Sequence, residues 1–416
     1  MSSKAPQRGR SSSGQHGRNA GGTSTSERKI QRRDISEGLI VPPIGTLDKP
    51  EATAGEDIVL KDVTHVGSYN WTNAKKPTII VPGSPSIWRD RPLPFTIAPD
   101  KGIQFMDQNA FRMPSSPLYP LFRAVDVVAE ENGRSVIWPE VDFVTDRNGL
   151  RKLLRWINNT ADPFRIDMQL AGRRTVLLSR WEKQARVWAD GKGYGFQFEK
   201  ESTRKAPGCE NGTSHHSIVK YDLGGLIIVV RFEVDACISE RSDLGSPASS
   251  DIDNLAHTLS GVSVSTPTQP ASIGIRASTT KLDVIKAGQR VPPNSVIEMT
   301  TMTTMTAKSG NKWRDRYAQL YLSQTPHYYI AMHRNGEFYE ITKHRLGSKE
   351  LEPEHKEAQG GFRRLRVLLE MIQDLVVEHG STTMLSLVYR DKKLEIFKRD
   401  DQQGVVPDDV LVRFNV

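Results

Sequence analysis

The sequence predicts an α/β (α+β) fold in which mixed central β-sheets are flanked by helices. Short apolar runs rich in β-branched residues alternate along the chain with segments whose apolar residues recur at helical spacing. The run over 226–237 is long and β-branched enough to be a central strand covered on both faces. With 416 residues and 37% hydrophobic content, the chain can bury one large core or two modest ones.

The N-terminal region, residues 1–35, has the composition of a disordered basic arm. It is rich in Ser, Gly and Arg and has almost nothing to bury, so it cannot offset the entropy cost of folding. The basic cluster at 28–33 suits a non-specific RNA tether or a nuclear import signal, and a merely solubilising tail is an equal alternative. A mitochondrial transit peptide is disfavoured because no apolar helix face could form. Residues 36–416 are expected to form a single domain.

The first part of this domain is expected to consist of short strands separated by turns. Pro-rich linkers at 41–43 and 81–85 separate strand candidates at 58–60 and 77–81. Apolar residues at helical spacing then predict a helix over 121–130.

A strand followed by a helix places an arginine where an anion could bind. Residues 141–145 alternate in polarity, Asp146 can cap the following helix, and leucines then recur at helical spacing. Arg147 falls at the junction, where backbone N–H groups and the helix dipole favour an anion. Alternatively, the basic residues of this segment form only the solvated face of the helix.

Between residues 164 and 199 we expect a hairpin, a helix and a tightly packed turn. The runs 164–170 and 175–178 predict the hairpin, and 181–188 predicts the helix. The segment 193–199 combines glycines with aromatic residues. Alone, Glu199 would be an ordinary surface residue, but such a turn would aim its carboxylate in a definite direction.

The predicted central strand ends in two acidic residues, Glu233 and Asp235. Side chains at i and i+2 of a strand share a face, so these carboxylates are expected side by side. Adjacent buried carboxylates repel each other and lose hydration unless a cation or a shared proton compensates them. Glu298 lies in another short apolar run, as it would if a neighbouring strand brought it to the same end of the sheet. A divalent metal is the simplest compensation.

The later part of the chain is expected to complete the scaffold. Residues 239–279, rich in Ser, Pro and Thr, predict a mobile insertion. A helix over 312–323 carries a polar stripe that includes Gln319; the stripe suits either solvent or phosphate contact. The remaining predicted elements are strands at 328–332 and 336–341, a helix over 362–378, a hairpin over 384–397 and a last strand at 410–414.

Several other kinds of site and protein class are disfavoured. His215 and His216 have no second ligand pair at metal spacing and are expected in a loop. Cys209 and Cys237 cannot form a disulfide framework, which favours a reducing compartment. No stretch approaches the 18 or so apolar residues of a membrane span. The net charge of +8 favours a polyanionic partner such as nucleic acid.

Five short motifs follow one another in a recognisable order. They are an Arg in a strand-to-helix turn (144–149), Gly-aromatic-x-Phe-Glu (195–199), Glu-x-Asp (233–235), a Glu-hydrophobic step (298–299) and Ala-Gln-Leu in a helix (318–320). Each motif is weak alone. Together they resemble the decapping exoribonuclease (DXO-like) family over roughly residues 120 to 345.

This resemblance implies a fold related to the restriction-endonuclease-like (PD-(D/E)xK) nucleases. It also implies an enzyme that removes incomplete or non-standard 5′ caps from RNA and can degrade the exposed chain 5′→3′. The implied partners are RNA 5′ ends and a 5′→3′ exoribonuclease, in the nucleus or the cytoplasm, and no membrane.

The resemblance also implies roles for seven residues. Carboxylates and one backbone carbonyl would hold Mg²⁺ or Mn²⁺ as hard oxygen ligands. Two polar side chains would bind the 5′-terminal phosphates. The implied metal ligands are Glu233, Asp235, Glu298, the carbonyl of Met299 and, directly or through water, Glu199; the phosphate ligands are Arg147 and Gln319.

One position departs from the family pattern. Where the family has Glu-hydrophobic-Lys, this chain has Glu298, Met299 and Thr300. Threonine carries no charge, and a lost proton-transfer partner commonly costs about 10²–10⁴ in rate. Lys308 lies roughly 30 Å further along an extended strand and cannot substitute for it. Two hypotheses follow: a metal-dependent RNA 5′-end hydrolase, weakened by Thr300, or a catalytically inactive DXO-like fold that binds RNA 5′ ends or a protein partner.

Overall fold

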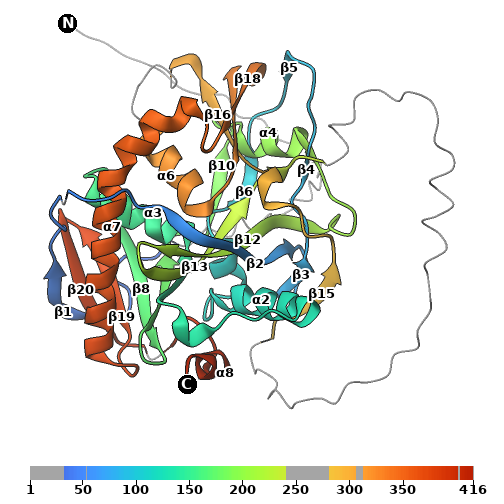
Figure 1. Ribbon diagram of the computed structural model, residues 1–416. Helices are drawn as coiled ribbons and strands as arrows, with labels where there is room; N and C mark the ends of the chain where they lie inside the picture. The colour runs from blue at the N-terminus through green and yellow to red at the C-terminus, as the bar shows by residue number, and fades with distance from the viewer. Residues whose placement is uncertain (1–31, 53, 240–280, 306–312, 402, 416) are drawn as a thin grey trace, which may run out of the picture.

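The computed structural model describes residues 32–415 except 53, 240–280, 306–312 and 402 (Figure 1). The predicted arm therefore lies almost wholly outside the described residues, as do Lys308 and nearly all of the predicted insertion over 239–279. The predicted fold class is confirmed, because large mixed sheets are flanked by helices. No helix among the described residues is both long enough and apolar enough to span a membrane.

An eleven-stranded sheet forms the centre of the molecule. Its order is β1 (Leu39–Leu47), β20 (Lys393–Arg399), β19 (Leu385–Arg390), β8 (Phe164–Ala171), β9 (Thr175–Trp181), β7 (Phe143–Asp146), β13 (Leu226–Val234), β12 (Gly212–Leu223), β2 (Leu60–Thr72), β3 (Thr78–Pro82) and β15 (Asp283–Ala287). β7 runs parallel to both β9 and β13. The carboxyl ends of these central strands therefore meet at one edge, where Asp146 pairs in register with Arg231.

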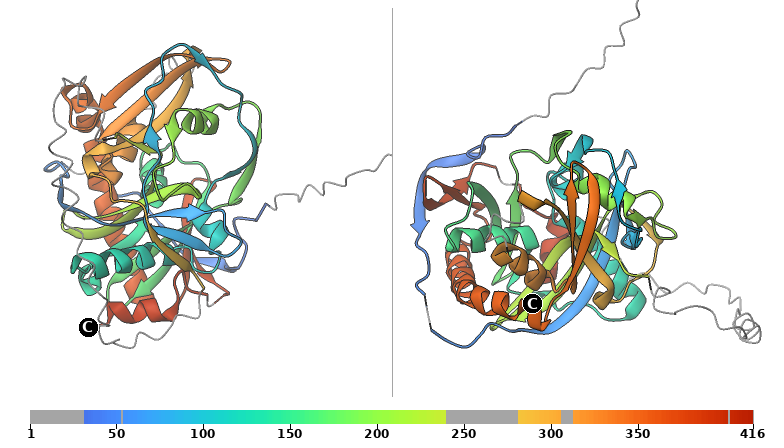
Figure 2. Two further views of the ribbon diagram at one scale, coloured as in Figure 1. Left: turned by 90° about the vertical axis from the view of Figure 1, so that its right-hand side faces the viewer. Right: turned by 90° about the horizontal axis from the view of Figure 1, so that it is seen from above.

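Helices cover both faces of this sheet (Figures 1 and 2). On one face lie α3 (Arg147–Ile157), α6 (Trp313–Ser323) and α7 (Glu352–His379), whose apolar side chains join one core cluster with the sheet. On the other face lie α2 (Tyr119–Asn132) and α8 (Asp408–Leu411), which form a second cluster. Each buried leucine or valine contributes about 1.5–3 kcal/mol, so the two clusters hold the helices against the sheet.

A second, seven-stranded sheet lies beside the first. Its order is β11 (Thr203–Arg204), β4 (Ile87–Trp88), β14 (Ala236–Cys237), β16 (Val296–Thr303), β17 (His327–Arg334), β18 (Glu337–Arg345) and β5 (Phe95–Thr96). α4 (Gly195–Glu201) packs against it through the fully buried Phe198. A ribbon of β6 (Lys101–Phe105) and β10 (Arg186–Asp190) stands apart from both sheets. The predicted strand over 226–237 is thus divided, with β13 in the first sheet and β14 in the second.

Both cysteines are buried and free. Cys209 lies where two chain segments approach closely: a Cβ added to Gly288 would lie 2.7 Å from the backbone of Gly83 and 2.8 Å from the Cys209 sulfur. Gly288 also has φ of +77°, so only glycine fits there without strain. Cys237 lies in β14, where its N–H donates to the carbonyl of Ser86 at 2.9 Å.

Most predicted helices and hairpins are confirmed, but three strand or helix assignments are wrong. The expected linker at 41–43 belongs to β1, which tolerates prolines because it is an edge strand whose register shifts between Ile40 and Gly45. The expected helix over 181–188 is instead the end of β9 and the start of β10, whose partner β6 is distant in sequence. The expected strand at 410–414 is α8 followed by a 3₁₀ turn, because Val410 and Phe414, four residues apart, are both buried on one helical face.

Two further expectations near the site need correction. His215 and His216 lie in β12 rather than in a loop, and both are buried. Asp146 does precede α3, but its side chain makes no capping hydrogen bond because Arg231 binds its carboxylate.

Candidate active site

The predicted acidic residues line a pocket between the two sheets. The pocket has a volume of about 530 Å³, and Glu199, Glu233 and Asp235 form one part of its wall. Much of the remaining lining is polar and uncharged, and it also includes the aromatic residues Phe105 and Phe196 and the basic residues Lys200 and Lys205.

The break between β13 and β14 positions two of these carboxylates. Asp235 is the residue at which the chain passes from one sheet to the other. β14 pairs with β16 so that Ala236 lies opposite Ile297, which brings Asp235 next to Glu298. The N–H of Met299 donates to Asp235 Oδ2 at 2.6 Å. The expectation that a neighbouring strand brings Glu298 to Asp235 is therefore confirmed.

Glu199 is held by the helix α4 rather than by the turn that the sequence predicted. The ring of Phe198 stacks on Phe338 with a centroid distance of 4.8 Å, which fixes the helix on the second sheet. At its start, the N–H of Gln197 donates to Asp100 Oδ1 at 2.8 Å. Glu199 consequently points from a well-packed helix toward the pocket that also contains Glu233 and Asp235.

The carboxylates raise one another's pKa. Burial, followed by the charges of Glu233 and Glu298, raises the pKa of Glu199 to about 8. Burial and the charges of Glu298 and Glu199 raise the pKa of Asp235 well above its usual value. Desolvation by the surrounding protein also raises the pKa of Glu233, although the charges of Arg180 and Arg147 oppose the rise and the residue remains accessible to water. In a protein without a bound cation, ionising all of them is costly.

Glu298 differs from the other carboxylates because side chains donate hydrogen bonds to both of its oxygens. Arg147 Nη1 lies 2.8 Å from Glu298 Oε2 and 3.3 Å from the hydroxyl of Ser323. Gln319 donates to the other oxygen, Oε1. The two predicted phosphate-binding residues, one opening α3 and one on α6, therefore converge on a predicted metal ligand.

The donor set suits a divalent ion in its chemistry but not in the present orientation of its side chains. Several hard oxygen donors with raised pKa values face a solvent-accessible pocket, which suits Mg²⁺ or Mn²⁺ chemically. In the described part of the chain, however, no three His, Cys, Asp or Glu residues are grouped as a metal site. Both oxygens of Glu298 and one of Asp235 instead accept hydrogen bonds from protein donors. The residues thus fit the chemistry of the ion, and their side chains would have to turn to coordinate it.

Thr300 follows Glu298 on the same face of β16. Its side chain is hydrogen-bonded to Tyr328, and no charge stands at this position. The cation bound to Glu298 is Arg147, which comes from α3 and not from the strand that carries lysine in the resembled family.

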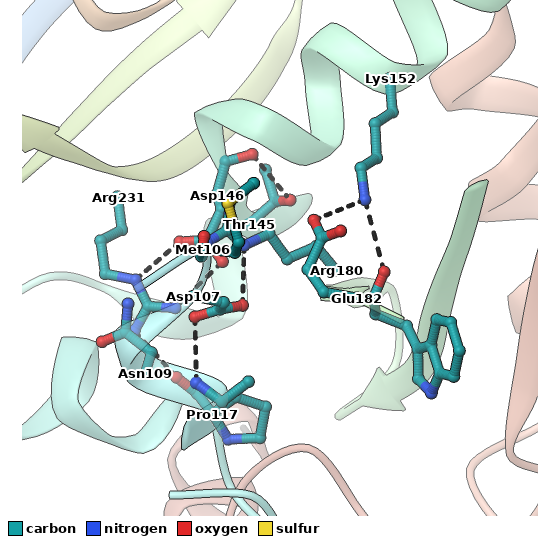
Figure 3. Close-up of polar contacts among 12 residues, drawn as sticks. Met106, Asp107, Asn109, Pro117, Thr145, Asp146, Lys152, Arg180, Glu182 and Arg231 are labelled. Atoms are coloured by element: carbon teal, nitrogen blue, oxygen red, sulfur yellow. Dashed lines mark hydrogen bonds and ion pairs between the residues drawn. The ribbon is translucent and has the colours of Figure 1, made fainter. Parts of the chain in front are cut away.

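Behind the pocket lies an ionic network that the sequence did not predict (Figure 3). Arg231 is completely buried and binds Asp146 through two bonds of 2.6 and 3.0 Å. Arg180 Nε lies 2.7 Å from Asp107 Oδ2, and Asp107 also caps the short helix α1 (Gln108–Arg112). The positive charge of Arg180 also opposes the rise in the pKa of Glu233, so this arginine acts electrostatically on the site.

Only one member of this network left a signal in the sequence. Arg231 interrupts an otherwise apolar strand, and a buried charge requires a partner, although the sequence could not say which. Arg180 and Asp107 are far apart along the chain and neither breaks a local pattern.

The chain matches one protein-family model over most of its length. Residues 56–415 match a family described as "Domain of unknown function (DUF8563)". No curated protein matches the sequence.

Solved structures of Rai1 proteins share the fold. Rai1 of S. pombe in complex with 3′-FADP is 15% identical, with 84% of this chain and 97% of that chain covered and a TM-score of 0.54. Rai1 of Scheffersomyces stipitis in complex with (3′-NADP)+ and calcium ion is 12% identical, with 89% and 99% covered and a TM-score of 0.56. Rai1 of Candida albicans in complex with pU5-Mn2+ is 12% identical, with 89% and 98% covered and a TM-score of 0.55. The DXO-like fold expected from the five motifs is therefore confirmed.

Proposed function

Since this chain belongs to the DUF8563 family and has the fold of the Rai1 proteins, we propose that it is a metal-dependent hydrolase of RNA 5′ ends. The observation that carries the proposal is the pocket that Glu199, Glu233 and Asp235 line together beside Glu298, where desolvation and the charges of neighbouring carboxylates raise the pKa of all three. Two of the similar Rai1 structures contain a nucleotide or RNA together with a divalent ion.

The four carboxylates and the carbonyl of Met299 would hold Mg²⁺ or Mn²⁺. When bound, the ion would activate water and stabilise charge on the attacked phosphate. Glu199 would release the proton that its raised pKa favours, because carboxylate ligands bind metals in the deprotonated form.

Arg147 and Gln319 would bind the 5′-terminal phosphates. A guanidinium can donate two parallel hydrogen bonds to a phosphate, and Arg147 uses one of its terminal nitrogens for Glu298 in the described arrangement. Binding of RNA would therefore compete with this ion pair and release Glu298 toward the metal.

The proposal also covers the substrates, the protein partner and the compartment. The substrates would be incomplete or non-standard 5′ caps, with 5′→3′ degradation of the exposed chain as a second step. A 5′→3′ exoribonuclease would be the protein partner, and the protein would act in the nucleus or the cytoplasm.

A second candidate function is supported by Thr300. An uncharged residue stands at the position of the family lysine, and Glu298 is already neutralised by Arg147. In this alternative, the fold binds RNA 5′ ends or a protein partner without hydrolysing RNA.

Substitution of Thr300 by lysine distinguishes the two candidates. Thr300→Lys should accelerate release of the 5′ end from triphosphorylated, cap-like and NAD-capped RNA by up to about 10²-fold. The new ammonium must displace the contact with Tyr328, so stability should fall by about 1–3 kcal/mol. The companion variant Thr300→Lys/Glu298→Gln should lose the gain. Binding of RNA ends without hydrolysis in both wild type and Thr300→Lys would favour the inactive binder.

A further inference from the structure

Three arginines follow one another along α3 at intervals of one helical turn. Their side chains become more exposed away from the pocket: 11% for Arg147, 14% for Arg151 and 36% for Arg155. Eight residues separate the first from the last, which corresponds to a rise of about 12 Å along the helix. The row therefore leads from Glu298 to the outer surface of the α3–α6 pair.

A cavity of about 320 Å³ lies at the outer end of this row. Arg155 from α3 lines it, together with Arg314 and Arg316 from α6. Asn158 and Thr160 add an amide and a hydroxyl. The lining is thus rich in hydrogen-bond donors and positive charge.

The negative charge available locally does not balance these arginines. Asp315 is the carboxylate of the lining, and it is shared by Arg151 at 2.5 Å and Arg155 at 2.6 Å. Arg314 is paired with Glu357, yet its buried Nε has no hydrogen-bond partner. Arg316 contacts the sulfur of Met302 at 3.1 Å and forms no ion pair with the carboxylates that the structure describes.

We propose that this cavity is a subsite for a phosphate of the RNA chain, about 12 Å along α3 from Arg147. The inference rests on the proposed function, because Arg147 is the residue that would bind the 5′-terminal phosphate. Planar guanidinium groups match phosphate geometry, and several of them around one cavity favour a polyanion. The separation is too long for neighbouring phosphates of a 5′-triphosphate, so the ligand is the chain downstream of the 5′ end.

The test compares a short with a longer RNA. Fluorescence anisotropy in EDTA, which prevents hydrolysis, would measure binding of 5′-monophosphorylated dinucleotide and octanucleotide RNA. Arg155→Gln/Arg316→Gln should weaken octanucleotide binding about tenfold and leave dinucleotide binding unchanged. For this double variant, the plot of log affinity against log salt concentration should be shallower by about 0.7, because one phosphate of the single strand is no longer neutralised.

Two further variants make this result specific. Arg173→Gln/Lys393→Gln removes the same charge from an exposed turn and from the exposed start of β20, both in the first sheet, and should leave octanucleotide affinity unchanged. Arg316→Gln alone, which breaks no ion pair, should show part of the loss even if the double variant unfolds.

Four outcomes would overturn the inference. Equal weakening of both RNAs, or equal weakening by the control variant, would show general electrostatic attraction without a subsite. Unchanged octanucleotide binding in the Arg155 and Arg316 variants would remove the subsite but leave the proposed function. No RNA binding by the wild type would remove both.

Discussion

Carboxylates are compensated differently in two neighbouring regions of the molecule. In the network behind the pocket, each buried acid has a cation: Asp146 has Arg231 and Asp107 has Arg180 (Figure 3). In the pocket itself, Glu199, Glu233 and Asp235 make no ion pair with the cations that the structure describes, and their pKa values are raised. The same fold thus pairs each carboxylate with a cation in the network and leaves the three carboxylates of the pocket without a paired cation among the described residues.

This difference separates structural from functional charge. A compensated pair specifies how strands and helices meet, and its loss should appear as lost stability. An uncompensated group lowers stability and is retained at sites that use it. The following four experiments test this distinction, beginning with the largest expected effect.

Breaking the buried pair should be the most damaging change. Arg231→Met leaves the buried Asp146 without its cation, so the free energy of unfolding in urea should fall by about 3–5 kcal/mol. The control Arg231→Met/Asp146→Leu removes both charges and should recover part of the loss. A decrease in the first variant no larger than that in the second would show that the pairing itself matters little.

Supplying a cation to the pocket should have the next largest effect. Mn²⁺ at 100 times its dissociation constant should stabilise the wild type by about 2.7 kcal/mol, seen as an increase in the unfolding temperature. Calorimetry should show that Glu233→Ala/Asp235→Ala no longer binds the ion. Equal Mn²⁺ binding by wild type and this variant would contradict the metal assignment.

Removing the negative charge of Glu199 should stabilise the metal-free protein. The pKa of Glu199 is about 8 in the folded state against 4.5 in the unfolded state, so the folded state binds the extra proton between these values. Stability must therefore fall as pH rises from about 5 to 8. Glu199→Gln should show a smaller decline and be more stable than wild type by about 0.5–2 kcal/mol at pH 8 in EDTA. Parallel pH profiles for the two proteins would show that Glu199 is already compensated.

The smallest effect is expected at the rim of the ionic network. Lys152 lies 2.8 Å from Glu182, whose side chain is 22% exposed, so water already screens this pair. Glu182→Gln should cost only about 0.2–1 kcal/mol in urea unfolding. A cost close to that of Arg231→Met would mean that burial does not govern how much each ion pair of this network contributes to stability.

The sequence predicted the acidic pocket better than its surroundings, for a physical reason. Glu233 and Asp235 lie two residues apart at the end of an apolar strand, and this local pattern is sufficient to expect paired carboxylates. The division of that strand between two sheets depends on its pairing with β16, about 60 residues away. The contact of Glu298 with Arg147 spans 151 residues and likewise has no local signature.

Several misassigned segments share that cause. The segment 181–188 has apolar spacing compatible with a helix, and only its pairing with β6 makes it extended. His215 and His216, which have no second ligand pair at metal spacing and were expected in a loop, lie in a strand that pairs with β2 on one side and β13 on the other. Propensity and periodicity depend only on the chain near each residue, whereas the secondary structure of these two segments is set by strands distant in sequence.

The two buried cysteines give this protein a built-in reporter of local opening. Burial raises the pKa of Cys237 to about 11, so little reactive thiolate exists while β14 remains paired in the second sheet. Cys237 follows Asp235 by two residues, whereas Cys209 lies beside Gly288, where the backbones of Gly83 and Gly288 pack closely together. The rate at which a thiol reagent modifies each one therefore measures the opening of a different segment. Protection of Cys237 relative to Cys209 would report ordering beside the acidic pocket in the unmodified protein, with no introduced label.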